Sequence, residues 1–304
     1  MTATALNGSQ SYGEKYRLLK ATRPFSLVVA VLSCLQGIIL GWQESSAPIF
    51  FAVALLLGGI LLQFAVNLIN DHSDLKELDQ RFPHCNDQQK QVIAQAIKRN
   101  FQLGLACFLA ATVIALYLMS LRGLDLLWLC LIGFSGAYFY TQEPINYKNR
   151  GLGVPIVFFM MGVLMITGSA YVMTGHFTFS VLIQSIPLSI LTALMLLSNE
   201  LRDFESDAAV GQRTMTVRIG YQLAVMIYKV MVVAAYISVL LLWLLGYMPF
   251  TGWVLLSIFA LKAPWQLLNV PAAQRVSITP LTGRFHAIFG SLLLLSYAMA
   301  AVLY

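Results

Sequence analysis

The sequence predicts an all-α membrane protein, with nine transmembrane helices in one bundle around a central cavity. Of its 304 residues, 59% are hydrophobic and only 11% are charged, whereas soluble domains carry roughly 25% charged residues. Apolar stretches of membrane length recur along the whole chain. They must be helices, because the edges of an open sheet would lack hydrogen-bond partners in lipid.

The nine apolar stretches follow one another with short polar connections and leave no room for a separate soluble domain. They cover residues 25–42, 47–69, 101–120, 126–141, 153–174, 177–198, 222–245, 250–268 and 285–304. The fourth stretch is the shortest. The first 24 residues are polar and basic, and they lack the features of a cleaved signal peptide. We therefore expect a cytoplasmic tail over residues 1–24 and one transmembrane domain over residues 25–304.

Basic residues lie almost entirely on one side of this predicted topology. The tail and the loops after the even-numbered spans share that side, whereas the opposite loops hold only Arg122. Loops rich in lysine and arginine stay in the cytoplasm. We therefore expect an integral protein of the bacterial inner membrane with a cytoplasmic N terminus. The net charge of +6 then reflects topology and contact with anionic lipid, and no nucleic-acid partner is expected.

Two polar segments that follow apolar spans share an Asn-x-x-x-Asp pattern. Residues four apart lie on one face of a helix, so each segment predicts a stripe of oxygen ligands. Such sites suit Mg²⁺, which keeps several waters and completes its shell with substrate phosphates. The sequence thus predicts diphosphate chemistry at the cytoplasmic membrane surface. The expected metal ligands are Asn70, Asp71, Asp74, Asp79, Asn199, Asp203 and Asp207.

One face of the second apolar stretch is already polar before the first motif begins. Gln63 and Asn67 precede Asn70 at helical spacing. Polar groups within a membrane are costly and usually face a bundle interior or a wet cavity, which favours a cavity here. The alternative is that these two side chains only form hydrogen bonds to neighbouring helices.

The second motif continues from Asn199 through Arg202, Asp203 and Asp207 to a Gly-x-x-Thr element ending at Thr214. This segment resembles the second aspartate-rich motif of the UbiA-type intramembrane prenyltransferases. The resemblance is to the 1,4-dihydroxy-2-naphthoate, or menaquinone, branch rather than to the 4-hydroxybenzoate branch. The stretch from Asn67 to Asp74 resembles the family's first motif. Further similarities cover most of residues 20–220, among them Arg23-Pro24, Tyr140-Thr141, Pro144 and a run of glycines from Gly151 to Gly175.

Two departures from the family pattern fall where substrates would bind. After Asp74 the usual third acid is displaced, which leaves Glu77 and Asp79 as alternatives for that position. Where the naphthoate branch often has Gly-Glu, this chain has Val154 and Pro155 after Gly153. An unusual aromatic acceptor is therefore also compatible with the sequence.

The resemblance and the chemistry of the residues imply a common mechanism. A polyprenyl diphosphate would lie with its tail in lipid and its diphosphate on Mg²⁺, and an aromatic acceptor would attack the allylic carbon. The expected catalytic residues are Asp74, Asp203, Asp207 and Tyr140, with Tyr138 and Tyr171 as lesser candidates for shielding the allylic cation. The expected substrate-binding residues are Arg23, Asn70, Asn199, Arg202, Lys148 and Arg213, with Arg202 alternatively a partner of a neighbouring acid.

Three function classes are compatible with the sequence. The first is a prenyltransferase acting on 1,4-dihydroxy-2-naphthoate with decarboxylation, or on another acceptor such as 4-hydroxybenzoate or a specialised metabolite. The second is an ion-coupled transporter, for which acids at the membrane midplane would be expected. The third is a structural membrane protein whose acids only contact loops.

Overall fold

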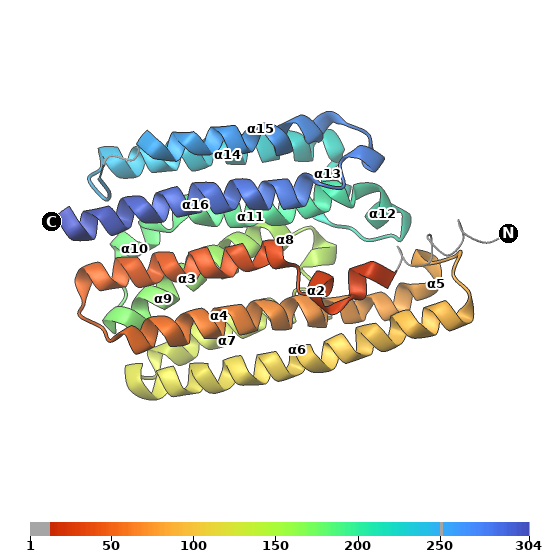
Figure 1. The fold of residues 1–304 in the computed structure, drawn as a ribbon, viewed down its shortest axis with the longest axis horizontal. Coiled ribbons are helices and arrows are strands. Elements are labelled where there is room, and N and C mark those ends of the chain that lie inside the picture. Colours follow the sequence, from red (N-terminus) through yellow and green to blue (C-terminus); the bar gives the residue numbers. More distant parts are fainter. Residues whose placement is uncertain (1–12, 250–251, 304) are drawn as a thin grey trace.

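The computed structural model describes residues 13–249 and 252–303, and these residues contain helices and no strands. Part of the predicted tail, residues 1–12, lies outside the described residues, as do residues 250, 251 and 304 of two predicted spans. The longer helices pack side by side, with α5 at one end of the molecule and the C-terminal end of α16 at the other (Figure 1). The helices are η1 (Glu14–Tyr16), α2 (Leu18–Ala21), α3 (Pro24–Glu44), α4 (Ile49–Asn70), η2 (Asp71–Glu77), α5 (Leu78–Arg81), α6 (Asp87–Arg122), α7 (Asp125–Tyr138), η3 (Lys148–Arg150), α8 (Gly153–Val157), η4 (Phe158–Leu164), α9 (Met165–Thr174), α10 (Phe179–Gln184), α11 (Ile186–Arg202), α12 (Phe204–Ala209), α13 (Met215–Ile219), α14 (Tyr221–Leu244), η5 (Gly252–Ser257), α15 (Ile258–Gln266), η6 (Leu267–Asn269), η7 (Ala272–Gln274) and α16 (Ile278–Leu303).

Among the described residues, six helices are long and apolar enough to cross a membrane. They are Pro24–Glu44, Ile49–Arg81, Asp87–Arg122, Gly153–Thr174, Tyr221–Leu244 and Ile278–Met299. The other three predicted spans are shorter or interrupted, so the count of nine spans stays a prediction. Helix α7 has only 14 residues. The sixth span is divided between α10 and α11 next to Pro187, and the eighth consists of η5 and α15 with Pro264 inside α15, because proline lacks the backbone N–H that continues a helix.

Local sequence signals set several of the helix ends. Pro24 occupies the first turn of α3, where its missing N–H costs no hydrogen bond, and Arg23 before it has a left-handed backbone with φ of 47°. Helix α6 begins with a capping box, in which Asn86 and Gln89 each accept a hydrogen bond from the other's backbone N–H. It ends at Gly123 with φ of 93°, a conformation that glycine adopts without steric penalty.

Helix α3 lies at the centre of the packing, against α4, α9 and α16. Its contact with α9 is close because glycines face that helix. A Cβ atom at Gly37 would lie only 2.3 Å from the Ile166 carbonyl oxygen and 2.5 Å from Ser169 Cβ. At Gly41 it would lie 2.4 Å from Met173 Cβ. Small residues at such positions let membrane helices approach each other.

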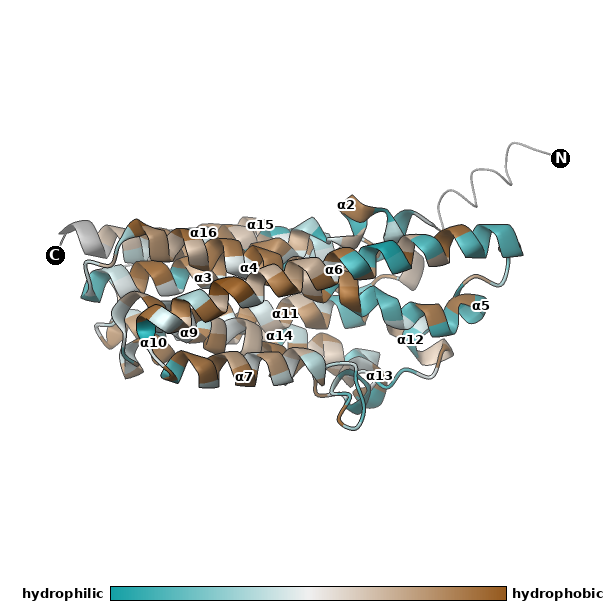
Figure 2. Ribbon diagram, turned by 90° about the horizontal axis from the view of Figure 1, so that it is seen from below, coloured by the Kyte–Doolittle hydropathy of each residue, from teal (hydrophilic) through white to brown (hydrophobic). Residues whose placement is uncertain are grey.

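The molecule has one polar end, where both predicted motifs lie. Hydrophilic residues gather on α5, α12, α13 and the first half of α6, while the remaining length of the long helices is mostly apolar (Figure 2). We call this the motif end. Helix α6 is 36 residues long, and it reaches from the motif end to the opposite end of the bundle (Figure 1).

The α3–α9 contact makes Gly37→Ala an informative substitution. The added methyl group would meet backbone and Cβ atoms that cannot rotate away, so we expect a loss of about 1–3 kcal/mol in folding stability, typical of overpacking. Gly58→Ala in α4 is the matched control, since its Cβ would meet only Ile114 Cγ2 at 3.5 Å. Thermal unfolding of both purified variants in detergent measures the difference, and equal melting temperatures would contradict the close packing.

Candidate active site

The first motif lies on a 3₁₀ helix rather than on the α-helix expected from the sequence. Helix α4 ends at Asn70, and η2 covers Asp71–Glu77. A 3₁₀ helix has three residues per turn, so Asp71, Asp74 and Glu77 share a face. The expected pairing of Asn70 with Asp74 on a regular α-helix is therefore wrong in its geometry. Asp71 and Asp74 are both buried.

Cationic and hydroxyl groups surround the buried carboxylates of the first motif. Asp74 accepts hydrogen bonds from Lys15 Nζ at 2.6 Å and from the Tyr16 hydroxyl at 2.9 Å. Arg81 lies 3.5 Å from Asp74 and 2.7 Å from Glu77. Arg23 donates to Asp71 Oδ1 at 2.5 Å. Each buried acid thus has a neighbouring positive charge, which offsets the cost of removing the carboxylate from water.

The short N-terminal helix η1 brings Lys15 and Tyr16 to the first motif. Tyr16 is fully buried, and its backbone carbonyl accepts a hydrogen bond of 2.8 Å from Asn100 in α6. Burial and the adjacent Asp74 carboxylate raise the pKa of the Tyr16 phenol, so this side chain stays a hydrogen-bond donor. The segment before the first span is therefore part of the site.

The second motif keeps the spacing that the sequence predicts. The Asp203 N–H donates to the Asn199 carbonyl at 3.0 Å, and the Asp207 N–H donates to the Asp203 carbonyl at 2.8 Å. These i to i+4 bonds keep Asn199, Asp203 and Asp207 on one face, although α11 gives way to α12 at Asp203. Arg202 donates to both Asp203 carboxylate oxygens, at 2.8 and 2.6 Å, so it is paired with a neighbouring acid in this structure, and its role in binding substrate stays a prediction.

The two motifs lie at the same end of the bundle (Figure 1), and cations beside the first motif act on acids of the second. Burial opposes ionisation of Asp203, but the hydrogen bonds and charge of Arg202, together with the charges of Lys15 and Arg23, lower the pKa of its carboxyl group. Burial raises the pKa of Asp207, opposed by the charges of Lys148, Arg81 and Lys15. Lys15 therefore acts on acids of both motifs.

A second buried group lies next to the second motif, around Glu200. Its Oε2 atom accepts a hydrogen bond of 3.0 Å from the Thr216 backbone N–H, whereas Oε1 is buried without a partner among residues 13–249 and 252–303. A Cβ at Gly153 would lie 3.3 Å from Glu200 Oε1 and 3.7 Å from Tyr140 Cε2. Glu200, Arg23 and Asp207 all act electrostatically on the Tyr140 hydroxyl. Tyr140 thus lies within the site.

Other predicted residues lie farther from these acids. Asp79 pairs with Lys90 at 2.7 Å, and its side chain is 87% exposed, whereas Glu77 shares Arg81 with Asp74. Arg213 is exposed, and its backbone N–H donates to Asn149.

The two lesser tyrosine candidates also lie away from the acids. Tyr138 is half exposed and stacks on Phe134. The Tyr171 hydroxyl donates to the Arg122 carbonyl at the opposite end of the bundle.

Sequence reasoning missed four groups of this site. Lys15, Tyr16, Arg81 and Glu200 all contact or act on the motif acids or Tyr140. Glu200 had a signal, since it lies within the second motif next to Asn199. No sequence signal indicated Lys15 or Tyr16 beyond the basic character of the tail, because these residues precede Asp74 by 59 and 58 residues, respectively.

The acids fit a hard divalent cation by their chemistry. Carboxylate and amide oxygens are the ligands that Mg²⁺ accepts, and Asp71 Oδ2 is buried with no hydrogen-bond partner in the part of the chain that the structure describes. Within the described residues, however, no three acids, histidines or cysteines are close enough together to hold a metal ion. The cations of Lys15, Arg23 and Arg202 occupy the carboxylates instead.

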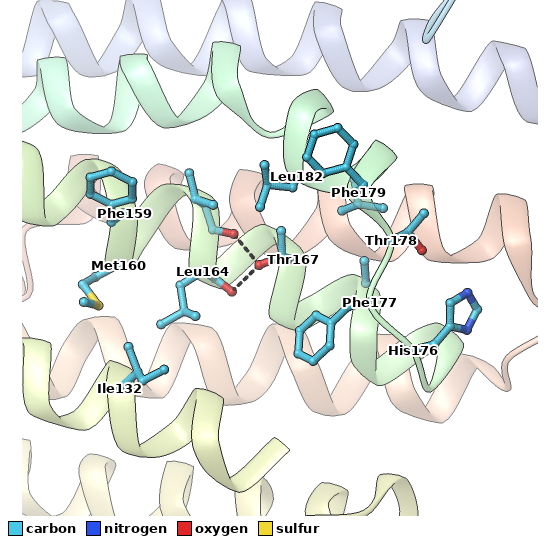
Figure 3. Close-up of a pocket in the computed structure, with 13 residues that line it drawn as sticks. Ile132, Phe159, Met160, Leu164, Thr167, His176, Phe177, Thr178, Phe179 and Leu182 are labelled. Atoms are coloured by element: carbon cyan, nitrogen blue, oxygen red, sulfur yellow. Dashed lines mark hydrogen bonds between the residues drawn. The ribbon is translucent and has the colours of Figure 1, made fainter. Parts of the chain in front are cut away.

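An apolar cavity lies in another part of the bundle, between α7, η4, α9 and α10 (Figure 3). Its lining includes Phe159, Leu164 and Phe179. The Thr167 hydroxyl in its wall donates to the carbonyl oxygens of Val163 and Leu164 in the preceding turn, at the end of η4, at 2.7 and 3.3 Å. The cavity is therefore suited to a hydrocarbon chain and contains none of the motif acids.

The chain is similar in sequence to a known protein family and to individual members of it. The profile of the UbiA prenyltransferase family matches residues 30–300. The chain is 26% identical to 1,4-dihydroxy-2-naphthoate octaprenyltransferase of Bacillus subtilis (strain 168), over 83% of this chain and 81% of that protein. It is 28% identical to the Escherichia coli (strain K12) enzyme of the same name, over 81% of each chain.

A third relative and one solved structure extend the comparison. The 2-carboxy-1,4-naphthoquinone phytyltransferase of Synechocystis sp. is 27% identical over 88% of this chain and 83% of its own length. A UbiA homolog from Archaeoglobus fulgidus bound to GPP and Mg²⁺ superposes with a TM-score of 0.57 and 15% identity, covering 91% of this chain and 99% of that chain. At that identity, the structural match establishes the fold.

The ion pair between Lys15 and Asp74 predicts a change in lysine reactivity. In Asp74→Asn the ammonium group loses its charged partner, so acylation of Lys15 should become faster by up to about fivefold, as expected for a pair worth at most ~1 kcal/mol. Quantitative mass spectrometry after brief acylation measures this rate. Lys98, which is exposed, is the internal control, and an unchanged ratio of Lys15 to Lys98 labelling would contradict the contact.

Proposed function

The chain belongs to the UbiA prenyltransferase family, and we propose that it transfers a polyprenyl group to 1,4-dihydroxy-2-naphthoate with loss of the carboxylate. It is an integral membrane protein and an aromatic prenyltransferase. One observation carries the proposal: two acidic motifs, linked by shared cations, lie at one end of an otherwise apolar bundle. The naphthoate-specific relatives support the choice of acceptor, because the similarity covers about four-fifths of their length or more.

In this proposal the diphosphate of the donor binds between the two motifs. Asp71, Asp74, Asp203 and Asp207 would hold Mg²⁺, with Asn70 and Asn199 as further oxygen ligands. When bound, Mg²⁺ would neutralise charge on the diphosphate and favour its departure. Lys15, Arg23 and Arg202 would bind phosphate oxygens in place of their carboxylate partners. This exchange keeps each buried charge paired, which is needed in a poorly hydrated site.

The ring of Tyr140 is suited to shield the reacting allylic carbon. As the carbon–oxygen bond of the donor lengthens, its electron pair leaves with pyrophosphate, and positive charge develops on the allylic carbon. An aromatic face stabilises a nearby cation. Glu200, whose Oε1 atom has no hydrogen-bond partner within the described residues, lies beside Tyr140. Burial raises its pKa to about 7, so its ionised form would add negative charge on the same side.

The acceptor supplies the electron pair for the new carbon–carbon bond. The electron-rich ring carbon that bears the carboxylate attacks the allylic carbon. The carboxylate then leaves as CO₂, and the electrons of the broken carbon–carbon bond return to the ring. The acceptor carboxylate needs a cation before it leaves. Lys148 is the strongest candidate, because its charge acts on both Glu200 and Asp207. Arg213 is a second candidate, at the edge of the site.

The proposal includes a membrane orientation for the protein. The motif end faces the cytoplasm of a bacterial cell, because it carries most of the basic residues outside the apolar spans. Diphosphate, metal and acceptor would then reach the site from the aqueous side, and the prenyl chain would extend between apolar helices into lipid.

The acceptor is tested by competition in one reaction. With a single polyprenyl diphosphate and Mg²⁺, the purified protein should prenylate 1,4-dihydroxy-2-naphthoate in preference to 4-hydroxybenzoate, and the product should lack the carboxylate. Mass spectrometry identifies both products. Asp203→Ala should lower turnover by orders of magnitude and serves as the inactive control. Exclusive prenylation of 4-hydroxybenzoate would defeat the choice of acceptor, and pyrophosphate release without Mg²⁺ would defeat the metal site.

The third acid of the first motif is tested by a matched pair of variants. Glu77 shares the buried face with Asp74, whereas Asp79 is exposed and paired with Lys90. We therefore expect Glu77→Gln to raise the Mg²⁺ concentration needed for half-maximal rate several-fold, and Asp79→Asn to leave it nearly unchanged. Titration of Mg²⁺ at saturating donor measures both. The opposite ranking would return the ligand to Asp79.

A further inference from the structure

Buried polar groups continue inward from the second motif, along the contact between α11 and α16. The hydroxyl oxygens of Thr192 and Thr279 and both ring nitrogens of His286 have no hydrogen-bond partner within the described part of the chain. All three side chains are at most 1% exposed. Buried polar groups without partners are rare and costly, particularly at membrane depth. Because all three side chains lie on two packed helices, we expect a bound group to supply the missing hydrogen bonds.

The register of the two helices aligns these groups. A Cβ at Gly283 would lie 3.4 Å from Met195 Cε, and one at Gly290 would lie 3.1 Å from Leu188 Cδ1. A step of seven residues along α16 thus matches a step of seven in the opposite direction along α11. The same antiparallel register sets His286 level with Thr192.

Extended toward the motif end, this register sets Thr279 level with Asn199. Since seven helical residues rise about 10 Å, Thr192 and His286 lie roughly 10 Å below the level of Asn199. Side chains on a helix lean toward its N terminus, and α16 begins at the motif end. His286 therefore leans toward the acids.

We propose that Thr192 and His286 form the binding position for a hydroxyl group of the aromatic acceptor. This inference rests on the proposed function. A neutral imidazole has one hydrogen-bond donor and one acceptor, and a threonine hydroxyl has both capacities. A phenolic hydroxyl donates to the imidazole and accepts from the threonine, so it satisfies both residues. No other group of the described chain does so.

The chemistry of the acceptor selects which hydroxyl binds. In a 1,4-dihydroxy-2-naphthoate, the hydroxyl next to the carboxylate forms an internal hydrogen bond, whereas the hydroxyl at position 4 is free. With the carboxylate held by cations at the motif end, the free hydroxyl points inward, toward Thr192 and His286. The two ends of the acceptor are thereby distinguished, and the ring is oriented between them.

Met195 separates this position from the motif acids. It is packed on Gly283 at the intermediate level, and its unbranched thioether side chain changes rotamer readily. An acceptor that enters from the motif end displaces the Met195 side chain, while the backbone of the two helices stays in contact through Gly290 and Leu188.

The test compares two ligands that differ by one hydroxyl group. Equilibrium binding of 4-hydroxy-2-naphthoate and 2-naphthoate to the purified full chain, without donor or metal, isolates the hydroxyl contribution. The wild-type protein should bind the hydroxylated ligand about tenfold more tightly, as expected for one buried hydrogen bond. Thr192→Val and His286→Phe should abolish this preference and leave 2-naphthoate binding unchanged. His286→Gln, which keeps a donor and an acceptor, should restore part of it.

Thr282→Val is the matched control, because Thr282 is equally buried on α16 but already pairs with the Tyr228 hydroxyl at 2.9 Å. It should keep the hydroxyl preference. Preference retained in both Thr192→Val and His286→Phe would overturn the proposal. So would a lower melting temperature in Thr192→Val with preference intact, which would indicate a structural water at this position.

A kinetic measurement separates this inference from the proposed function. In the prenyl-transfer assay, Thr192→Val should raise the acceptor KM about tenfold and leave the donor KM unchanged. If the wild-type protein prenylates no aromatic acceptor, the proposed function fails. If it does prenylate one and the variants show the wild-type acceptor KM and hydroxyl preference, only the hydroxyl position fails.

Discussion

Carboxylates removed from water at the end of an apolar bundle need positive charge beside them, and this constraint organises the motif end. Asp71 is only 1% exposed, and a buried carboxylate without a partner costs several kcal/mol. Its partner, Arg23, stands at the first turn of α3 in a left-handed backbone conformation. This ion pair joins the start of α3 to the first motif, so the packing of α3 and the neutralisation of the buried charge depend on each other.

The same constraint explains why the N-terminal segment folds back onto the site. Lys15 and Tyr16 both contact Asp74, and Asn100 of α6 fixes the backbone at Tyr16. These groups place a positive charge and a hydroxyl donor directly beside the Asp74 carboxylate, which offsets the cost of removing it from water.

Much of the fold and of the second motif could be predicted from the sequence, because both depend on local periodicity. Hydrophobic stretches predicted helices at membrane length, and the four-residue spacing predicted the common face of Asn199, Asp203 and Asp207. The first motif was less predictable, since its polar residues are spaced both by four residues, Asn70 to Asp74, and by three, Asp71 to Asp74 to Glu77, and the sequence does not show that the chain changes to a 3₁₀ helix at Asp71. The contacts of Lys15 and the alignment of His286 with Thr192 depend on packing between segments far apart in the chain. Such packing leaves no local pattern in a single sequence, so these contacts could not be predicted.

The length of α6 sets the depth of the reaction in the bilayer. Asn100 precedes Arg122, at the far end of this helix, by 22 residues, or about 33 Å at 1.5 Å per residue, close to the ~30 Å hydrocarbon thickness of a membrane. With α6 spanning the bilayer, Asn100 and its hydrogen bond to Tyr16 place Asp74 near the hydrocarbon boundary, just below the lipid phosphates. In the proposed reaction, an isoprenoid donor diffusing in one leaflet would carry its head group close to this height. It would therefore reach the acids by lateral movement alone, without being lifted out of the membrane or drawn into its interior.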